Sequence, residues 1–186
     1  MLYAPIHLVS LAEVMQANAM TRNSTVALPE DDYLGLVGQV AYMVSSLEWT
    51  ILGDLPGLAP YLPAELNTSA LAGKSTGQIA GALSKAVDQI SDVDVRAYVE
   101  LAGRLLGEAT ELRNDMLHAR PATIGKHQRL YRWKPTDWRG AGRAFVIDVA
   151  WLNSTIDKLS TASSALSEVR PLHKNSAFNK TPLDGA

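Results

Sequence analysis

Hydrophobic residues recur at spacings of three and four along several long stretches of the chain, which is the pattern of helices that bury one face. The longest stretch is expected to begin after Ser91, a suitable N-cap, and to end near Arg120. Pro121 sets this limit because proline disfavours helical backbone at the residue before it. The pattern predicts helices over 2–20, 29–53, 66–72, 75–90, 91–120 and 148–166.

One region departs from the helical spacing. Residues 130–133 alternate between apolar and basic side chains and can pair with the apolar residues 144–147 across a glycine-containing turn region at 140–142. This arrangement predicts a small, irregular β-hairpin. The fold class expected is all-α, an up-and-down bundle of four to five helices with this hairpin before the last one. The expected organisation is one domain at 1–170, with an N-terminal helix and break at 1–28, a basic aromatic insertion at 121–144, and a flexible tail at 171–186.

Composition narrows the class of protein. The chain has 186 residues, 47% of them hydrophobic and 19% charged, which is ordinary for one globular domain. It has no cysteine, which excludes disulfides and thiolate metal sites. No stretch reaches the roughly 18 apolar residues that span a bilayer, and the apolar N-terminus has no basic residue before Arg22. We therefore expect a cytoplasmic protein without a membrane partner.

Metal and cofactor chemistry finds no support in the sequence motifs. The chain contains no HExxH, EF-hand or paired-carboxylate arrangement, and no GxSxG nucleophile elbow. We therefore expect neither a metal nor a cofactor. The four histidines are too dispersed along the chain to indicate a metal site: His7, His118, His127 and His173.

Charge is distributed unevenly. The formal net charge is −2, yet residues 113–143 carry +6 and leave −8 for the remainder of the chain. The same segment contains Tyr131, Trp133 and Trp138, and cations with flat rings are the groups that bind RNA phosphates and unstacked bases. The alternative is a solvated loop whose aromatic rings pack onto the bundle. The residues expected to bind RNA are Arg120, Lys126, Arg129, Arg132, Trp133, Lys134, Arg139 and Arg143.

Candidate chemistry lies where this segment begins, because Arg113 and His118 stand five residues apart. A guanidinium is always charged and matches phosphate oxygens, and an imidazole titrates near neutrality. RNA supplies its own nucleophile, the 2′-hydroxyl, so a base, a cation and a phosphate held in line suffice for cleavage without a metal. Five residues rotate by about 140° on an ideal helix, so Arg113 and His118 do not share a face, whereas Asn114 and His118 do. The site needs a wide groove, such as a cleft between two symmetric subunits.

The same residues also have an ordinary structural interpretation. The helix dipole favours a histidine in a last turn, and Arg113 can pair with a neighbouring carboxylate such as Glu108 or Asp115. Asn114 argues against this interpretation, because asparagine is a poor residue inside a helix. Asp115 supports it, since it places a negative charge beside the supposed phosphate site unless it points elsewhere or holds Arg113.

The run that begins Arg113-Asn114 and ends at His118 resembles the RxxxxH signature of the HEPN superfamily. These proteins are compact helical bundles that include metal-independent ribonucleases of toxin–antitoxin and phage-defence systems. The order of elements over residues 29–169 also looks like that of bacterial HEPN-like proteins. The resemblance implies a homodimer in which two copies of the motif meet across the interface, and an antitoxin or another protein as a further partner.

The resemblance also implies roles for individual residues. Arg113 is the phosphate-stabilising cation, His118 the general base or acid, and Asn114 the polar residue that orients the site. Asp115 is common within such motifs. Glu48 resembles an acidic residue that some members place near the active cleft, although a single helical glutamate beside a tryptophan is usually a surface residue.

Three functions remain open at this point. In the first, the protein is a dimeric endoribonuclease that leaves 2′,3′-cyclic phosphate and 5′-hydroxyl ends. In the second, it is a catalytically inactive dimeric module that binds RNA, a nucleotide or a protein partner. In the third, it is an interaction protein with no role at nucleic acid.

Overall fold

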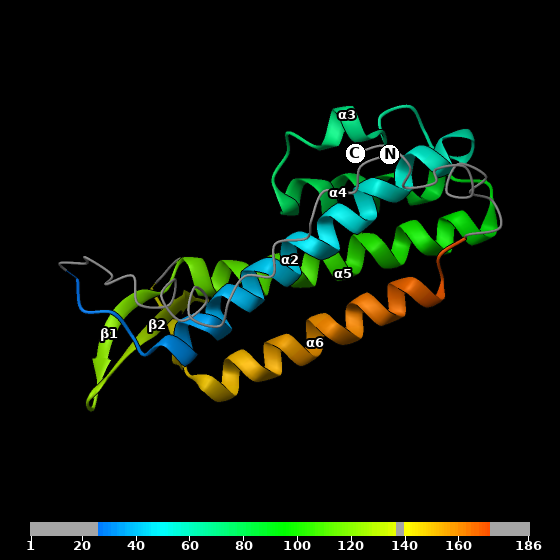
Figure 1. Ribbon diagram of the computed structural model, residues 1–186. Helices are drawn as coiled ribbons and strands as arrows, with labels where there is room; N and C mark the ends of the chain where they lie inside the picture. Colours follow the sequence, from blue (N-terminus) through cyan, green and yellow to red (C-terminus); the bar gives the residue numbers. More distant parts are fainter. Residues whose placement is uncertain (1–25, 137–139, 172–186) are drawn as a thin grey trace, which may run out of the picture.

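Long helices run along the molecule, and a small sheet lies at one end of them (Figure 1). This computed structural model describes residues 26–136 and 140–171. The helix expected over 2–20, Arg139, and all but the first residue of the expected tail lie outside these ranges. The elements are α2 (Asp31–Leu58), the 3-10 turn η1 (Ala59–Tyr61), α3 (Thr68–Leu71), α4 (Thr76–Ala86), the 3-10 turn η2 (Val87–Gln89), α5 (Val93–Leu117), β1 (Arg120–Ile124), β2 (His127–Pro135), β3 (Gly142–Ile147) and α6 (Val149–Glu168).

Helix α2 is longer than its sequence pattern predicts. The expected end is Gly53, but the helix continues to Leu58 although Pro56 lies inside it. Proline has no N–H to offer to the carbonyl four residues earlier, which here belongs to Leu52. The Thr68 hydroxyl donates a hydrogen bond to that carbonyl oxygen at 3.0 Å. The first residue of α3 therefore supplies the hydrogen bond that the proline removes from α2.

The other helices begin at or next to the caps that the sequence indicates. Ser75 and Gln78 form a capping box at the start of α4. Asp148 accepts a backbone hydrogen bond and opens α6, as expected. Helix α5 is capped by Asp92, whose carboxylate accepts two backbone N–H groups, one residue later than the expected Ser91. These side chains satisfy backbone donors that have no partner within the helix itself.

The sheet contains three antiparallel strands in the order β1, β2, β3. The expected hairpin is present, with Leu130 opposite Ile147 and Trp133 opposite Ala144. Strand β1, Arg120–Ile124, is an addition that the sequence pattern does not predict. The structure is about 66% helical and 14% strand. The prediction of an all-α bundle with an irregular hairpin is therefore wrong, and the protein is a mixed α/β fold.

Strand β1 lacks the usual sequence signals of a strand. Pro121 cannot donate to a ladder, but it is tolerated because β1 is an edge strand that pairs only with β2. Gly125 has φ +62° and is the first of two turn residues between β1 and β2. Glycine in that position is typical of the type II′ hairpin turn. The segment expected as an insertion at 121–144 is thus a regular sheet that extends to Ile147.

Tyr33, buried near the start of α2, joins the helices to the sheet. Its hydroxyl donates to the carbonyl oxygen of Ile147 at 2.7 Å and accepts from the N–H of Leu130 at 3.1 Å. Because Leu130 and Ile147 are cross-strand partners, the hydroxyl bridges β2 and β3. Burial raises the pKa of Tyr33, which keeps the hydroxyl protonated for both contacts. The start of α2 is therefore held beside the end of β3 and the start of α6.

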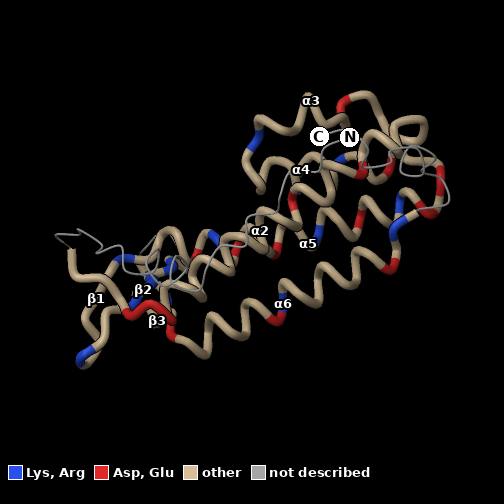
Figure 2. The backbone as a smooth tube through the Cα atoms, in the orientation of Figure 1, with Lys and Arg blue, Asp and Glu red and all other residues tan. Residues whose placement is uncertain are grey.

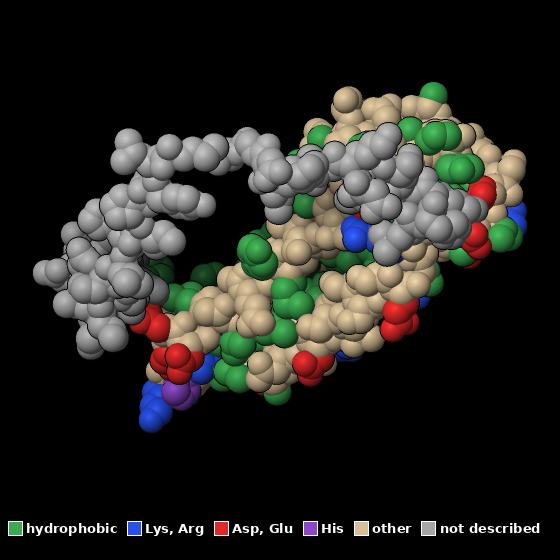
Figure 3. Space-filling model, turned by 45° about the vertical axis from the view of Figure 1, so that its right-hand side comes forward, with side chains coloured by type: hydrophobic (Ala, Val, Ile, Leu, Met, Phe, Trp, Pro, Cys, Tyr) green, Lys and Arg blue, Asp and Glu red, His purple; other side chains and the backbone are tan. Residues whose placement is uncertain are grey.

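The hydrophobic core lies between the long helices. Helix α2 packs against both α5 and α6, α4 packs against α5, and Ile147 extends the core to the sheet. On the face seen in Figure 3, hydrophobic side chains form a band along the long helices, and charged side chains stand at its margins. Of the helices in the described ranges, none has the length and apolar character needed to span a bilayer.

A carboxylate is buried near the end of α2. Asp54 is fully buried, and its Oδ2 accepts hydrogen bonds from the Tyr98 hydroxyl at 2.5 Å and from Nε of Arg170 at 2.7 Å. Nη2 of Arg170 lies 2.7 Å from Oδ1, an electrostatic contact, since within the described residues Oδ1 accepts no hydrogen bond. Burial, and after it the hydrogen bond to Asp54, raises the pKa of Tyr98. This cluster ties α2 and α5 to the residues that follow α6.

Replacing Asp54 by alanine is expected to lower the free energy of unfolding by about 3 kcal/mol, because the Arg170 charge and the Tyr98 hydroxyl lose their partner. The effect lies at the low end of the usual ~3–5 kcal/mol, since the Arg170 side chain is 28% exposed and can turn toward water. Urea denaturation followed by circular dichroism measures the change.

Glu108→Ala is the matched control for this measurement. Glu108 pairs with Arg104 at 2.8 Å, but the two side chains are 60% and 59% exposed. Breaking this pair should change the free energy of unfolding by less than about 0.5 kcal/mol. Equal effects of the two substitutions would show that the buried cluster contributes no more than a surface ion pair.

Candidate nucleic-acid interface

Helix α5 ends at Leu117, one residue before the histidine of the motif. His118 is the C-cap, and its backbone N–H donates to the carbonyl oxygen of Asn114 at 2.9 Å. The His118 residue is exposed, and Asn114 is half-buried. The prediction that the motif occupies the end of a long helix is confirmed, and the imidazole is accessible to a ligand from solvent.

Arg113 lies on a different face of α5 from His118. The two positions differ by about 140° around an ideal helix, and Arg113 is half-buried whereas His118 is exposed. No residue in the described ranges forms an ion pair or hydrogen bond with the Arg113 side chain. Asp115 therefore does not hold Arg113, and one copy of the chain does not gather the arginine and the histidine of the motif at one point.

Asp115 instead binds the sheet. Its side chain is 14% exposed, with Oδ1 3.2 Å from Nε of Arg132 and Oδ2 3.3 Å from Nζ of Lys134. Lys134 also contacts Glu111, one turn earlier on α5, at 2.8 Å. The hydrogen bond to Glu111, together with that to Asp115, raises the pKa of Lys134. Two acids of α5 thus hold two basic residues of β2, and these cations are tethers between helix and sheet.

The two neighbours of Arg132 along β2 face the other side of the sheet. Side chains alternate along a strand, so Tyr131 and Trp133 face away from the side that carries Arg132. His118, Arg120, Tyr131 and Trp133 line a cleft of about 220 Å³. The guanidinium of Arg120 lies over the Tyr131 ring, 5.3 Å from its centroid. A titratable base, a cation and two aromatic rings therefore converge at the end of α5.

The Trp133 indole lies against Gly142 on the neighbouring strand. A Cβ atom at Gly142 would be 2.5 Å from Cζ2 of Trp133 and 2.8 Å from the carbonyl oxygen of Lys134. Only glycine fits here, because it has no Cβ atom. The indole can therefore lie against the backbone of this residue. The sequence interpretation places Gly142 in a turn region and so misses this role. The signal that could have found it is a glycine diagonally across from an aromatic residue in a hairpin.

Arg129 is a third tether. Its Nη1 lies 2.6 Å from Oε2 of Glu30, the N-cap of α2, and its guanidinium lies over the Tyr33 ring, 4.6 Å from the centroid. His127 contacts the other oxygen of Glu30. Hydrogen bonds from His127 and then Arg129 lower the pKa of Glu30 from 4.5 to about 2. Strand β2 is therefore bound to the start of α2 as well as to the end of α5.

Fewer basic side chains are available to contact RNA than the composition suggests. Lys and Arg positions gather at the sheet end of the molecule in Figure 2, close to acidic positions of the helices. Lys126 is exposed in the turn between β1 and β2, and Arg143 lies over Phe145, 5.2 Å from the ring centroid. Among the described residues, Arg120, Lys126 and Arg143 have no carboxylate partner. Arg139 lies outside the described ranges.

The two acids that the sequence singles out, Glu48 and Asp115, do not line the cleft. Helices α2 and α5 run in opposite directions, with Asp54 against Tyr98, so Glu48 lies roughly 20 Å from His118 along the helix axis by the 1.5 Å rise per residue. Asp115 is engaged with β2. Within the described ranges, no three His, Cys, Asp or Glu side chains are grouped so as to hold a metal ion.

Comparison with known proteins places the chain in no family. No protein-family model, no curated protein and no solved structure matches it. The resemblance to HEPN proteins therefore depends on residues 113–118 and on the order of elements alone.

Replacing Gly142 by alanine is expected to displace the Trp133 indole, because the new methyl group overlaps its six-membered ring. In protein labelled with 5-fluorotryptophan, the fluorine resonance of Trp133, assigned with Trp133→Phe, should shift and broaden. Gly107→Ala is the control, because nothing lies within 4 Å of a Cβ built there. An unchanged Trp133 resonance in Gly142→Ala would contradict the contact.

The Glu30 contacts predict a pH dependence of stability. Since the pKa of Glu30 is lowered from 4.5 to about 2 in the folded state, the stabilisation is complete above about pH 4.5 and is lost as the pH falls toward 2. The free energy of unfolding should therefore fall less steeply over this range in Glu30→Gln than in the wild type. Glu100→Gln, a change at an exposed acid on α5, should follow the wild-type curve. Parallel curves for Glu30→Gln and wild type would refute the expectation.

Proposed function

We propose that this protein is an endoribonuclease of HEPN type that binds single-stranded RNA across the outer face of the sheet and cleaves it without a metal. The observation that carries the proposal is the cleft in which His118 and Arg120 meet the rings of Tyr131 and Trp133. The cation attracts a phosphate, and the rings stack on unpaired bases. The imidazole is exposed and therefore able to reach a ribose bound between them.

The proposed reaction uses the nucleophile that RNA carries. His118 removes the proton from the ribose 2′-hydroxyl, and the 2′-oxygen forms a bond to the adjacent phosphorus. The Arg120 guanidinium stabilises the negative charge that develops on the phosphate oxygens. The bond from phosphorus to the 5′-oxygen then breaks, and this oxygen takes a proton from an acid that a second copy of the chain supplies or from the imidazolium formed at His118. The products end in 2′,3′-cyclic phosphate and 5′-hydroxyl.

Arg120 thereby takes the role that the resemblance gives to Arg113. Arg113 is separated from His118 by about 140° around α5, so it reaches the same phosphate only from a second copy of the chain. We include a homodimer in the proposal for this reason, with Arg113 or Asn114 of one copy completing the cleft of the other. An antitoxin that covers the cleft is the protein partner that fits a ribonuclease of this kind.

One feature of the cleft favours a second function, a binding module without catalysis. Of the four residues that line the cleft, His118 is the only histidine, the residue type that most often serves as a general base or acid. A single copy therefore offers one group for two proton transfers, the removal at the 2′-oxygen and the delivery at the 5′-oxygen. If no second copy supplies the other group, the same surface holds RNA or a nucleotide and releases it unchanged.

Purified wild type and His118→Ala, incubated with a single-stranded oligoribonucleotide of mixed sequence, separate these functions. If the protein is the proposed enzyme, His118→Ala should lower the cleavage rate by about 100-fold or more, the usual contribution of general base catalysis, with little change in affinity for RNA. The products should carry cyclic phosphate ends, and the deoxyribose version of the oligonucleotide should bind and remain intact. Binding of the oligoribonucleotide without cleavage by the wild type would establish the binding module instead.

Two further variants locate the RNA. Trp133→Ala should weaken affinity by roughly tenfold, in line with the ~1–3 kcal/mol that base stacking contributes. Lys85→Ala removes an exposed cation from α4 and serves as the control, since it should leave affinity nearly unchanged. Equal losses in both variants would place the RNA outside the cleft and would overturn the assignment of the site.

A further inference from the structure

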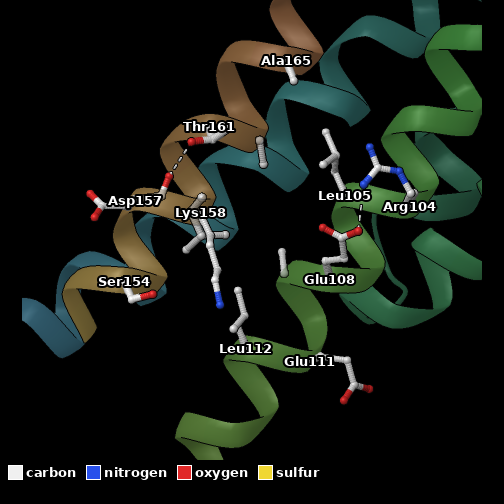
Figure 4. A pocket seen from close by; sticks show the side chains of 13 residues that line it. Arg104, Leu105, Glu108, Glu111, Leu112, Ser154, Asp157, Lys158, Thr161 and Ala165 are labelled. Atoms are coloured by element: carbon white, nitrogen blue, oxygen red, sulfur yellow. Dashed lines mark hydrogen bonds and ion pairs between the residues drawn. The ribbon is translucent and has the colours of Figure 1, made fainter. Parts of the chain in front are cut away.

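A second and larger concavity lies between α5 and α6. Its volume is about 740 Å³, and the described residues that line it all belong to these two helices. Figure 4 shows Leu105 and Leu112 of α5 projecting into the space between the helices, with Lys158 of α6 reaching across it and Asp157 turned away. The groove therefore has an apolar floor and charged margins.

Small residues make the groove accessible to another helix. Ala162 and Ala165 of α6 are half-buried, and so is Leu112 on the opposite wall. Leu105 and Leu159 lie deeper and are buried. Alanine side chains allow two helix backbones to approach closely, and the flanking leucines offer apolar contact. The groove is therefore a surface of the kind that a further helix packs against in a helical bundle.

The first residues of the chain contain a segment that fits this position. Over residues 8–19, Leu8, Leu11, Met15 and Ala19 follow the spacing of three and four that places them on one side of a helix. Charge in this segment is limited to Glu13, which falls on the opposite side. The segment lies outside the described ranges and follows the expectation of a helix over residues 2–20.

Length and direction agree with the groove. Twelve helical residues extend about 18 Å, and the wall from Ser154 to Ala165 on α6 extends about 17 Å. The bond from Tyr33 to Ile147 places the start of α2 beside the start of α6. The six residues from 20 to 25 span up to about 20 Å, enough to pass around α6. Since the segment leads toward that end, it would run antiparallel to α6.

We infer that residues 8–19 form an amphipathic helix that docks in the groove between α5 and α6, with Leu11 opposite Ala162 and Met15 opposite Lys158. A second copy of the chain fits less well, because pairing two grooves about a two-fold axis brings two Lys158 ammonium groups to one interface. The C-terminal residues 172–186 fit less well too, because they are polar and lack a helical apolar spacing. The N-terminal segment thereby covers the apolar floor from within the same chain.

The absence of cysteine from the chain allows a direct test in the full-length protein. Leu11→Cys combined with Ala162→Cys places two thiols in facing positions, and mild oxidation at low micromolar concentration should join them within one chain. The control is Ser10→Cys combined with Ala162→Cys, which has nearly the same tether length but faces about 100° away on an ideal helix. The facing pair should oxidise at least about tenfold faster, because disulfides require Cβ atoms about 3.5–4.5 Å apart.

Met15→Cys with Lys158→Cys repeats the test in the same register and covers the case in which the first pair disturbs folding. Electrophoresis without reductant and mass spectrometry distinguish a disulfide within one chain from one between two chains. Equal oxidation rates for the facing pairs and the control would overturn the docking. Disulfides found only between chains would assign the groove to a second copy and would overturn it equally.

Discussion

The ion pairs of Asp115 with Arg132 and Lys134 determine which side chains of β2 face α5 and which face away from it. They fix two alternate residues of β2 toward α5, so Trp133 between them and Tyr131 on the other side of Arg132 face the other way. Tyr131 and Trp133 are placed on the outer face for this reason, next to the histidine that ends α5. A charge that looks unfavourable beside a phosphate site in the sequence is the contact that orients the site.

The same constraint changes the meaning of the basic segment. Its +6 charge is partly neutralised inside the fold, because Arg129, Arg132 and Lys134 contact acids of α2 and α5. These cations hold a short sheet, which has little core of its own, against the ends of helices. The cations without carboxylate partners among the described residues lie at the turn, at β1 and on β3. Of these, Arg120 lies beside Tyr131, whereas Arg143, opposite Lys134 in the sheet, lies on the other face. The positive surface around the rings is therefore smaller than the composition implies.

The sequence predicts the helices well because their signals are local. The capping box of Ser75 and the cap at Asp148 lie within four residues of each helix start, and the expected pairing of 130–133 with 144–147 across the glycine turn is present. The sequence pattern does not predict strand β1, because the strand is short, contains Pro121 and follows directly from a helix. The burial of Asp54 is not predicted for a different reason, since its partners Tyr98 and Arg170 lie 44 and 116 residues away in the chain. No short-range pattern distinguishes such an acid from a surface one.

For the candidate site, the sequence identifies His118 and the neighbouring rings, and helix geometry alone separates Arg113 from His118 by about 140°. The sequence does not predict which cation lies beside the imidazole within one copy of the chain. Strand β1 begins two residues after His118, and the chain reverses at the turn between β1 and β2, which brings Tyr131 opposite Arg120 and places both in the cleft with His118. The cation that lines the cleft together with the imidazole is therefore Arg120, two residues later and in a strand. Arg113 is half-buried and has no ion-pair partner among the described residues. The candidate cleft depends less on the spacing of the motif than on the strands that follow it.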